Sequence, residues 1–213
     1  MTGRGLADRI AERVSRAGMD IDPSVLSGLV AYLRLLYRWN GQMNLTALAE
    51  DDRGLDRLVV EPLVAVQQMP EEARSVVDIG SGGGSPAVPL KLAVPGVALR
   101  MVESKSRKAA FLREVVRQLG LRDVVVETCR YEELLTRPEL HAATDVVTVR
   151  AVNVDAQALE GLQRLLRAGG VLFLFQSTGE DEAWGDRQQS LRWRGTYPLV
   201  ESLQSRLVVL EKT

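Results

Sequence analysis

The residues best suited to binding a ligand or doing chemistry lie in one short stretch, where an acid precedes three glycines at alternate positions. Asp78 is followed by Gly80, Gly82 and Gly84, and the apolar residues of segment 76–79 predict a buried strand before them. Glycines permit positive φ and let a ligand approach the backbone closely. Free N–H groups at the start of a following helix favour negative or polar ligand groups. The stretch therefore predicts a ligand-binding loop between a strand and a helix.

The spacing of these glycines limits the kind of ligand. A dinucleotide-binding loop would show the pattern G-x-G-x-x-G, and an ATPase phosphate loop would end in Gly-Lys-Ser or Gly-Lys-Thr. The stretch matches neither pattern. A second acid, Glu103, ends the next predicted strand about 20 residues after the glycines, where a carboxylate can accept hydrogen bonds from both hydroxyls of a ribose. By itself Glu103 fits NAD as well as S-adenosylmethionine.

The pattern D-x-G-x-G-x-G resembles motif I of the class I S-adenosylmethionine-dependent methyltransferases. In that resemblance the acid at Asp78 helps to position the loop and the methionine end of the cofactor. From residue 74 onward predicted strands alternate with helices, which indicates a parallel sheet with helices on both faces. Two last β-rich runs, 193–199 and 205–210, suit the antiparallel pair that closes a methyltransferase sheet. We therefore expect an α/β fold of the class I methyltransferase type, with a mostly parallel Rossmann-like sheet.

Helical periodicity dominates the chain before this sheet. Three segments repeat apolar residues at helical spacing: 5–18, 23–39 and 51–70. Gly41 is expected to stop the second of these helices. The expected strands are 76–79, 97–103, 123–128, 145–151 and 171–175, and the expected helices between them include 105–119 and 156–166. We predict two parts, an N-terminal helical lobe at residues 1–70 and a cofactor-binding methyltransferase domain at residues 71–213.

The segment after the second predicted helix makes the resemblance more specific. Trp39-Asn40, followed after three residues by Asn44-Leu45-Thr46, resembles the W-N-x-x-x-N-L-T signature of the glucose-inhibited division protein B family. These proteins are bacterial 16S ribosomal RNA guanine-N7 methyltransferases. Residues 85–90 resemble the same family's L-P-G-I-P-L and keep both prolines. The resemblance spans residues 25–177 and implies methylation of N7 of a guanine in the 16S rRNA of the small ribosomal subunit.

The resemblance also implies cofactor contacts. Ser85 places a hydroxyl beside the methionine moiety, and residues 129–134 resemble the family's S-R-V-E-E-F, in which the positions of Tyr131 and Glu132 bracket the adenine. Arg150 aligns with an arginine of the family's cofactor site, and its guanidinium can hold the cofactor carboxylate, a substrate phosphate or a guanine edge. The expected cofactor-binding residues are Asp78, Gly80, Gly82, Ser85, Glu103, Arg130, Tyr131, Glu132 and Arg150. No catalytic base is assigned, because the N7 lone pair of guanine is free at neutral pH.

The chain departs from the family pattern at two places. Relatives usually carry a histidine and an Asp-Ser pair within segment 51–70, where this chain has Val60, Glu61 and Pro62, and those polar side chains are expected to be missing. Relatives also have Lys-Gly after the fifth strand, where this chain has Gln176-Ser177. Two alternatives stay open for this reason. One is a diverged methyltransferase acting on another RNA or a small molecule, and the other is a nucleotide-binding module without turnover.

Composition sets wider limits. A chain of 213 residues with 46% apolar and 26% charged residues can bury one good core and is typical of a soluble globular protein. No segment approaches the length of a membrane span, and we expect no secretory signal, so the sequence favours a cytoplasmic protein. We also expect a monomer. The 27 basic and 28 acidic residues do not by themselves indicate nucleic-acid binding. The single Cys129 excludes an internal disulfide and a cysteine metal cluster, and no metal is expected.

Overall fold

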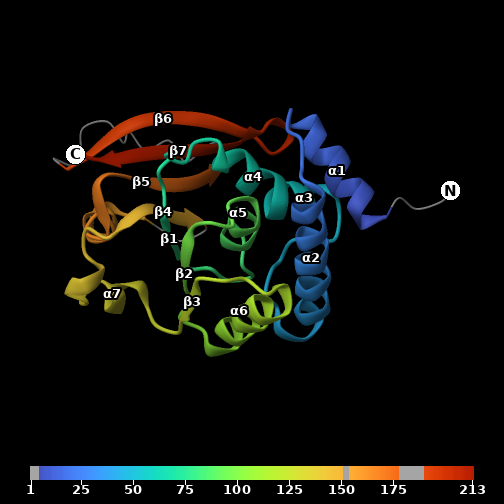
Figure 1. Cartoon of the computed structure of the whole chain (residues 1–213), viewed down its shortest axis with the longest axis horizontal. Coiled ribbons are helices and arrows are strands. Elements are labelled where there is room, and N and C mark those ends of the chain that lie inside the picture. Colours follow the sequence, from blue (N-terminus) through green and yellow to red (C-terminus); the bar gives the residue numbers. More distant parts are fainter. Residues whose placement is uncertain (1–4, 151–153, 178–189) are drawn as a thin grey trace.

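The computed structural model describes residues 5–150, 154–177 and 190–213, and it is built on one seven-stranded sheet flanked by helices (Figure 1). The strands are β1 (Ser75–Ile79), β2 (Ala98–Val102), β3 (Val124–Glu127), β4 (Thr144–Arg150), β5 (Leu166–Ser177), β6 (Leu191–Val200) and β7 (Ser205–Lys212). Their order is β3-β2-β1-β4-β5-β7-β6. The first five strands are parallel, whereas β7 runs antiparallel to both β5 and β6. The predicted fold class is therefore confirmed.

Helices and short helical turns connect and precede the strands. The helices are α1 (Leu6–Arg16), α2 (Pro23–Met43), α3 (Asp52–Leu55), α4 (Glu61–Val66), α5 (Ala87–Ala93), α6 (Ser106–Leu119), α7 (Tyr131–Leu134) and α8 (Ala156–Leu162). A π-helical turn spans Asp56–Val60, and 3₁₀ turns span Pro138–Leu140 and Glu201–Leu203. Within the described residues, no helix combines the length and the apolar character needed to cross a bilayer.

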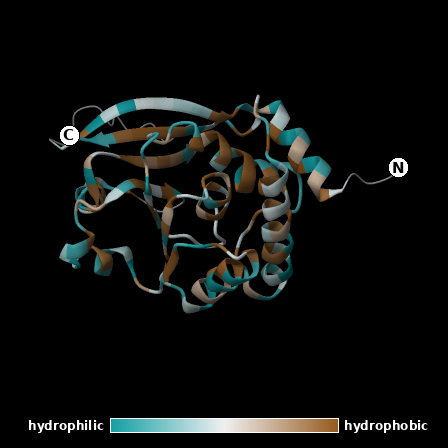
Figure 2. Ribbon diagram, viewed as in Figure 1, coloured by the Kyte–Doolittle hydropathy of each residue, from teal (hydrophilic) through white to brown (hydrophobic). Residues whose placement is uncertain are grey.

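The sheet separates two buried apolar clusters. Val76 packs on one face with residues of α1, α2, α4, α5 and α6, while its neighbour Val77 packs on the other face with residues of α7 and α8. This alternation follows from the two-residue period of a strand. Figure 2 shows apolar residues along the central strands and on the helix sides turned toward them. Because Asp78 lies two residues after Val76, it points to the face covered by the N-terminal helices.

The helix α2 is longer than predicted and passes through Gly41. It ends at Met43, and Asn44 adopts the left-handed conformation with φ of 49°. Asn40 supports this end, since its side-chain Oδ1 accepts the N–H of Thr46 at 2.8 Å and its carbonyl accepts the N–H of Asn44 at 3.2 Å. Asparagine tolerates the left-handed region better than other residues with a side chain, so Asn44 ends the helix in place of Gly41.

The predicted helix over residues 51–70 is divided into three pieces. The π-helical turn Asp56–Val60 separates α3 from α4, and α4 ends at Val66. The predicted helix 156–166 is also shorter, because α8 ends at Leu162. In its place β5 begins at Leu166, before the predicted start at residue 171. Gly170 lies against β4 so closely that a Cβ atom there would be 2.9 Å from the carbonyl oxygen of Thr144.

Candidate cofactor and substrate site

The glycine loop after β1 has a fixed conformation that requires its glycines. The backbone φ is 73° at Gly80, 53° at Gly82 and 93° at Gly84. The N–H of Gly80 donates to the carbonyl of Val102 at 2.9 Å, which ties the loop to the end of β2. The hydroxyl of Tyr32, from α2, donates to the carbonyl of Gly83 at 2.7 Å. The loop is thus held from both sides in a conformation that residues with side chains rarely adopt.

A cavity of about 280 Å³ opens at the carboxyl ends of β1 and β2, next to the loop that joins β3 to α7. Five of the nine predicted cofactor residues line it: Gly80, Glu103, Arg130, Tyr131 and Glu132. Its other lining residues are Ile79, Val102, Ser104 and Cys129. The structure therefore brings together the residues expected around the ribose and the adenine. Asp78, Gly82, Ser85 and Arg150 do not line this cavity.

Glu103 is almost fully buried at the edge of this cavity, with 6% of its surface exposed. Its Oε2 accepts the N–H of Gly82 at 2.9 Å, and its Oε1 accepts the N–H of Lys105 at 2.8 Å. One carboxylate therefore joins the glycine loop to the start of α6. Each oxygen of a carboxylate can accept more than one hydrogen bond, so both remain able to accept from ribose hydroxyls.

Asp78 is more deeply buried than Glu103, and one of its two carboxylate oxygens has no hydrogen bond to a described residue. Its Oδ1 accepts the hydroxyl of Thr148 at 2.6 Å, whereas its Oδ2 is buried and has no hydrogen bond within the described part of the chain. Burial raises the pKa of Asp78, although the charge of Arg150 opposes this shift. Buried acceptors without a partner are rare in native proteins. This oxygen therefore suits a ligand donor such as an ammonium group.

The raised pKa of Asp78 predicts a dependence of stability on pH. The folded chain binds a proton at Asp78 more readily than the unfolded chain, so stability from this group is lost as the pH rises through the folded pKa. We expect Asp78→Asn to unfold at a higher temperature than wild type at alkaline pH, with the gap closing as the pH falls. Thermal unfolding without cofactor measures this. Asp20→Asn, on an exposed residue, is the matched control; equal curves for both variants would contradict the prediction.

Arg150 ends β4 in a buried cluster of charges. Its Nη2 lies 2.9 Å from Oε2 of Glu61, and the other oxygen of Glu61 lies 3.1 Å from Nη1 of Arg57. The Arg150 Nη1 also donates to the hydroxyl of Ser85 at 3.1 Å, and its guanidinium carbon lies 4.5 Å from the centroid of the Phe175 ring. Two guanidinium groups thus share one carboxylate. The cluster carries a surplus positive charge at the carboxyl ends of β4 and β5.

The cluster shows what segment 51–70 contributes where relatives carry a histidine and an Asp-Ser pair. Glu61 is completely buried and anchors both arginines, so the segment contributes a carboxylate. Sequence reasoning missed it, and the available signal was an arginine four residues before an acid on a helical segment. Ser85 also has protein partners, since its hydroxyl donates to the carbonyl of Leu58 at 2.9 Å. Ala151, predicted as the end of the fourth strand, lies outside the described residues.

The chain matches one known protein family over most of its length. The family described as GidB, rRNA small subunit methyltransferase G, matches residues 26–203. The chain belongs to the GidB family. It is 36% identical to the ribosomal RNA small subunit methyltransferase G of Stenotrophomonas maltophilia strain K279a, over 86% of this chain and 84% of that one. The protein of the same name from Syntrophotalea carbinolica is 30% identical, over 89% of this chain and 87% of the relative.

Solved structures share the fold of this GidB-family chain at low sequence identity. The O-methyltransferase of Bacillus cereus in complex with SAH has a TM-score of 0.66 and 18% identity, covering 95% of this chain and 97% of that one. A mutant of MtNAS in complex with S-adenosylmethionine has a TM-score of 0.56 and 17% identity, covering 99% of both chains. These similarities concern the fold alone.

Family membership confirms the enzyme class and the cofactor that the sequence predicts. As a GidB-family protein the chain is a methyltransferase that depends on S-adenosylmethionine. The residues present fit this cofactor, because a cavity lies between the glycine loop and α7 and a buried acceptor of Asp78 has no partner among the described residues. The individual cofactor contacts of the nine residues stay a prediction.

Proposed function

We propose that this enzyme transfers the methyl group of S-adenosylmethionine to N7 of a guanine in the 16S rRNA of the small ribosomal subunit. The observation that carries the proposal is the pair of buried carboxylates, Asp78 and Glu103, beside the glycine loop of a GidB-family chain. We also propose that it acts in the cytoplasm as a monomer. Residues 1–70 would form the helical lobe and residues 71–213 the cofactor-binding domain.

Most of the predicted residues have a physical role in this proposal. Glu103 accepts from the ribose hydroxyls while holding the glycine loop, and Asp78 accepts from the ammonium group of the methionine end. Gly80 and Gly82 let the backbone approach the ligand closely. The start of α7 borders the adenine through Arg130, Tyr131 and Glu132. The ring of Tyr131 can stack on the base, and the Glu132 carboxylate can accept from its exocyclic amine.

The proposed reaction needs orientation more than proton transfer. S-adenosylmethionine supplies a methyl group activated by a sulfonium, and guanine N7 supplies a free lone pair. No side chain has to remove a proton before attack, because the N7 lone pair is free at neutral pH. Holding the two reactants in line and excluding water can supply most of the acceleration. Arg150, fixed by Glu61, is the best candidate for orienting the substrate or the cofactor.

The replacement of the family lysine by Gln176 does not leave this edge of the sheet without cations. Gln176 is buried, and its Oε1 has no partner in the described part of the chain. Arg57 and Arg150 share one carboxylate at the ends of the same strands, and Arg57 donates to the hydroxyl of Ser177 at 2.7 Å. Because positive charge is still present where a phosphate would approach, we favour an RNA substrate over a small molecule.

Methylation of isolated ribosomal subunits tests the proposal. Small subunits from cells that lack the corresponding methyltransferase are incubated with the full chain and S-adenosylmethionine carrying a labelled methyl group. We expect label in 16S rRNA, recovered as 7-methylguanosine after digestion to nucleosides, and none in a reaction without enzyme. Label in another nucleoside would refute the N7 assignment. Binding of S-adenosylmethionine without any RNA label would favour the small-molecule alternative.

A further inference from the structure

A second pocket lies on the N-terminal helices and has no part in the site described above. It has a volume of about 320 Å³ and is lined by Leu6, Arg9, Arg34, Tyr37 and Glu50. Its lining comes from α1, α2 and the segment before α3. It shares no lining residue with the cofactor cavity. Ligand pockets range from about 300 to 1,000 Å³, so this one is large enough for a small ligand group.

Tyr37 supplies the hydroxyl group of this pocket. Its oxygen is buried and makes no hydrogen bond with any described residue. Burial, with the nearby charge of Glu50, raises the pKa of Tyr37 to about 12. The phenol is therefore neutral at physiological pH and can both donate and accept a hydrogen bond. Such a group is costly to bury unless a ligand or water completes its hydrogen bonds.

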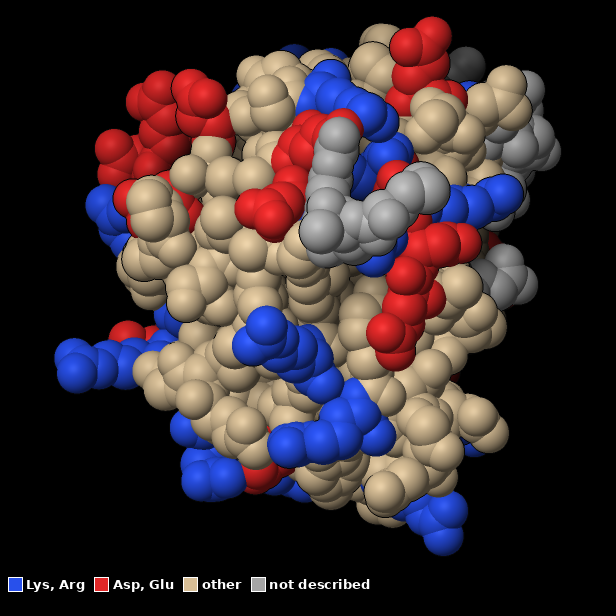
Figure 3. All heavy atoms as spheres, turned by 90° about the vertical axis from the view of Figure 1, so that its right-hand side faces the viewer, with Lys and Arg blue, Asp and Glu red and all other residues tan. Residues whose placement is uncertain are grey.

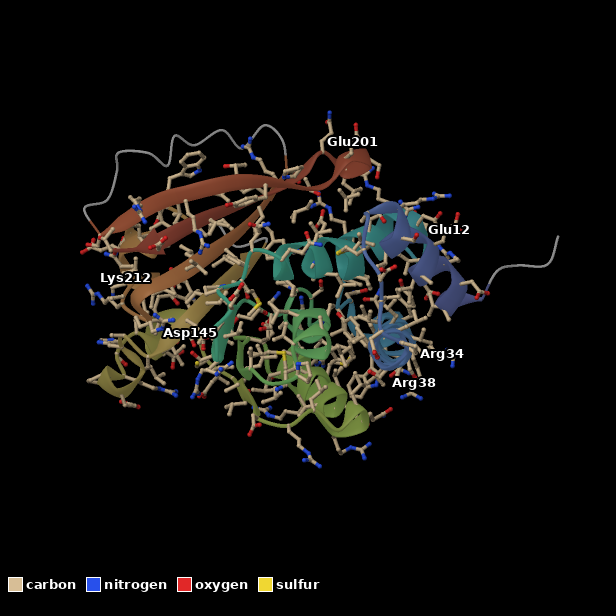
Figure 4. All side chains as sticks on the ribbon, turned by 45° about the horizontal axis from the view of Figure 1, so that its top comes forward. Glu12, Arg34, Arg38, Asp145, Glu201 and Lys212 are labelled. Carbon is tan, nitrogen blue, oxygen red and sulfur yellow. The ribbon has the colours of Figure 1, made fainter. Side chains whose placement is uncertain are left out.

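The two arginines of the pocket differ in whether their guanidinium groups already bind other residues of the protein. Arg9 is committed to the protein, since its Nε and Nη2 both donate to Oδ1 of Asp52, at 3.1 and 2.8 Å. Arg34 is exposed and makes no hydrogen bond or ion pair with a described residue. Figure 4 shows Arg34 and Arg38 projecting outward from the same helix. Arg9 thus fixes the wall of the pocket, while Arg34 remains available as a cation at its rim.

The lining of the pocket matches the parts of one nucleotide. The guanidinium of Arg34 suits a phosphate, and the apolar side chain of Leu6 suits the flat face of a base or a ribose. Glu50 can accept from a ribose hydroxyl or a base amine, and the hydroxyl of Tyr37 can pair with a base edge. Basic side chains gather mainly on the lower half of the face that carries α1 and α2 (Figure 3).

We propose that this pocket binds a nucleotide of the RNA substrate away from the methylated guanine. The inference rests on the proposed function in that the substrate is RNA. The arrangement of α2 supports it, because Tyr32 and Leu36 face the glycine loop while Arg34 and Tyr37 face the opposite side of the helix. One rigid helix therefore carries the RNA contact on one side and supports the cofactor loop on the other.

Charge reversal at two positions of α2 tests the site. Arg34→Glu should weaken binding of the full chain to isolated small ribosomal subunits about tenfold and lower the salt dependence by about one phosphate contact. Arg38→Glu is the matched control, since Arg38 is exposed on the same helix but does not line the pocket. If both variants lost the same affinity for the subunits, the effect would be general charge attraction, and the proposed pocket site would be wrong. Binding of S-adenosylmethionine should be unchanged in both.

Removal of one hydroxyl gives an independent test. Tyr37→Phe should weaken subunit binding about fivefold without lowering the unfolding temperature, because the hydroxyl has no hydrogen bond to residues 5–150, 154–177 or 190–213. Wild-type affinity in this variant would overturn the proposal. The proposal would also be wrong if free nucleoside monophosphates bound in the pocket but did not displace the ribosomal subunits. The binding assay tests the pocket, and the methylation assay tests the proposed function. If subunits bind but are not methylated, the proposed function is refuted, and the binding of the variants still decides the pocket.

Discussion

Glu103→Ala should bind S-adenosylmethionine about 100-fold more weakly than the wild-type chain. The carboxylate is buried beside the cavity and accepts backbone N–H groups from Gly82 and Lys105. The variant would lose the proposed hydrogen bonds to two ribose hydroxyls, each worth about 1.5–3 kcal/mol when one partner is charged. A loss of about 3 kcal/mol corresponds to about a hundredfold change in Kd. The glycine loop also loses its tie to α6, which adds to the effect.

Titration calorimetry with S-adenosylmethionine measures this change directly. Glu103→Gln keeps the shape but replaces one acceptor by a donor, so it should recover only part of the affinity. The matched control is Glu139→Ala, which removes an exposed acid outside the cavity and should leave Kd unchanged. A Kd within about threefold of wild type for Glu103→Ala would show that Glu103 does not hold the ribose.

The placement of Glu103 beside the glycine loop, as the sequence predicts, has a simple physical basis. The strand, the turn and the acid are local features, and parallel strands place their carboxyl ends at one edge whatever the details of packing. The position of Asp78 on its face follows from the same period of two residues. For this reason the spacing placed Gly80 and Glu103 at the cavity, whereas Arg130, Tyr131 and Glu132 at the start of α7 were expected there only from the family resemblance.

Contacts between distant segments were beyond the same reasoning. Glu61 meets Arg150 across 89 positions of the chain, and its local sequence reads only as part of a helix. The π-helical turn before it, which directs the acid inward, has no distinctive residue pattern. Even locally, Gly41 was expected to end α2, whereas the helix continues to Met43 and hydrogen bonds made by Asn40 support its end. Such features depend on packing that appears only when the elements assemble.

Glu61→Gln should have the largest effect on stability. It leaves Arg57 and Arg150 without their shared carboxylate, although their side chains are only 23% and 15% exposed. Breaking a buried ion pair by removing one partner costs about 3–5 kcal/mol, and the partial exposure of the arginines favours the lower value. We expect a loss of about 3 kcal/mol and an unfolding temperature lower by about 6–12 °C for a chain of this size. Chemical and thermal denaturation measure both quantities.

Two further variants separate the charge of Glu61 from its shape. Glu72→Gln breaks the exposed pair with Arg74, whose side chains are 85% and 74% exposed, and should cost about 0–1 kcal/mol. Glu61→Asp keeps the charge and should retain more stability and more methyl transfer than Glu61→Gln, because Arg150 can still be oriented. If Glu61→Asp and Glu61→Gln transferred methyl groups at equal rates while differing in stability, the cluster would support the fold without orienting Arg150.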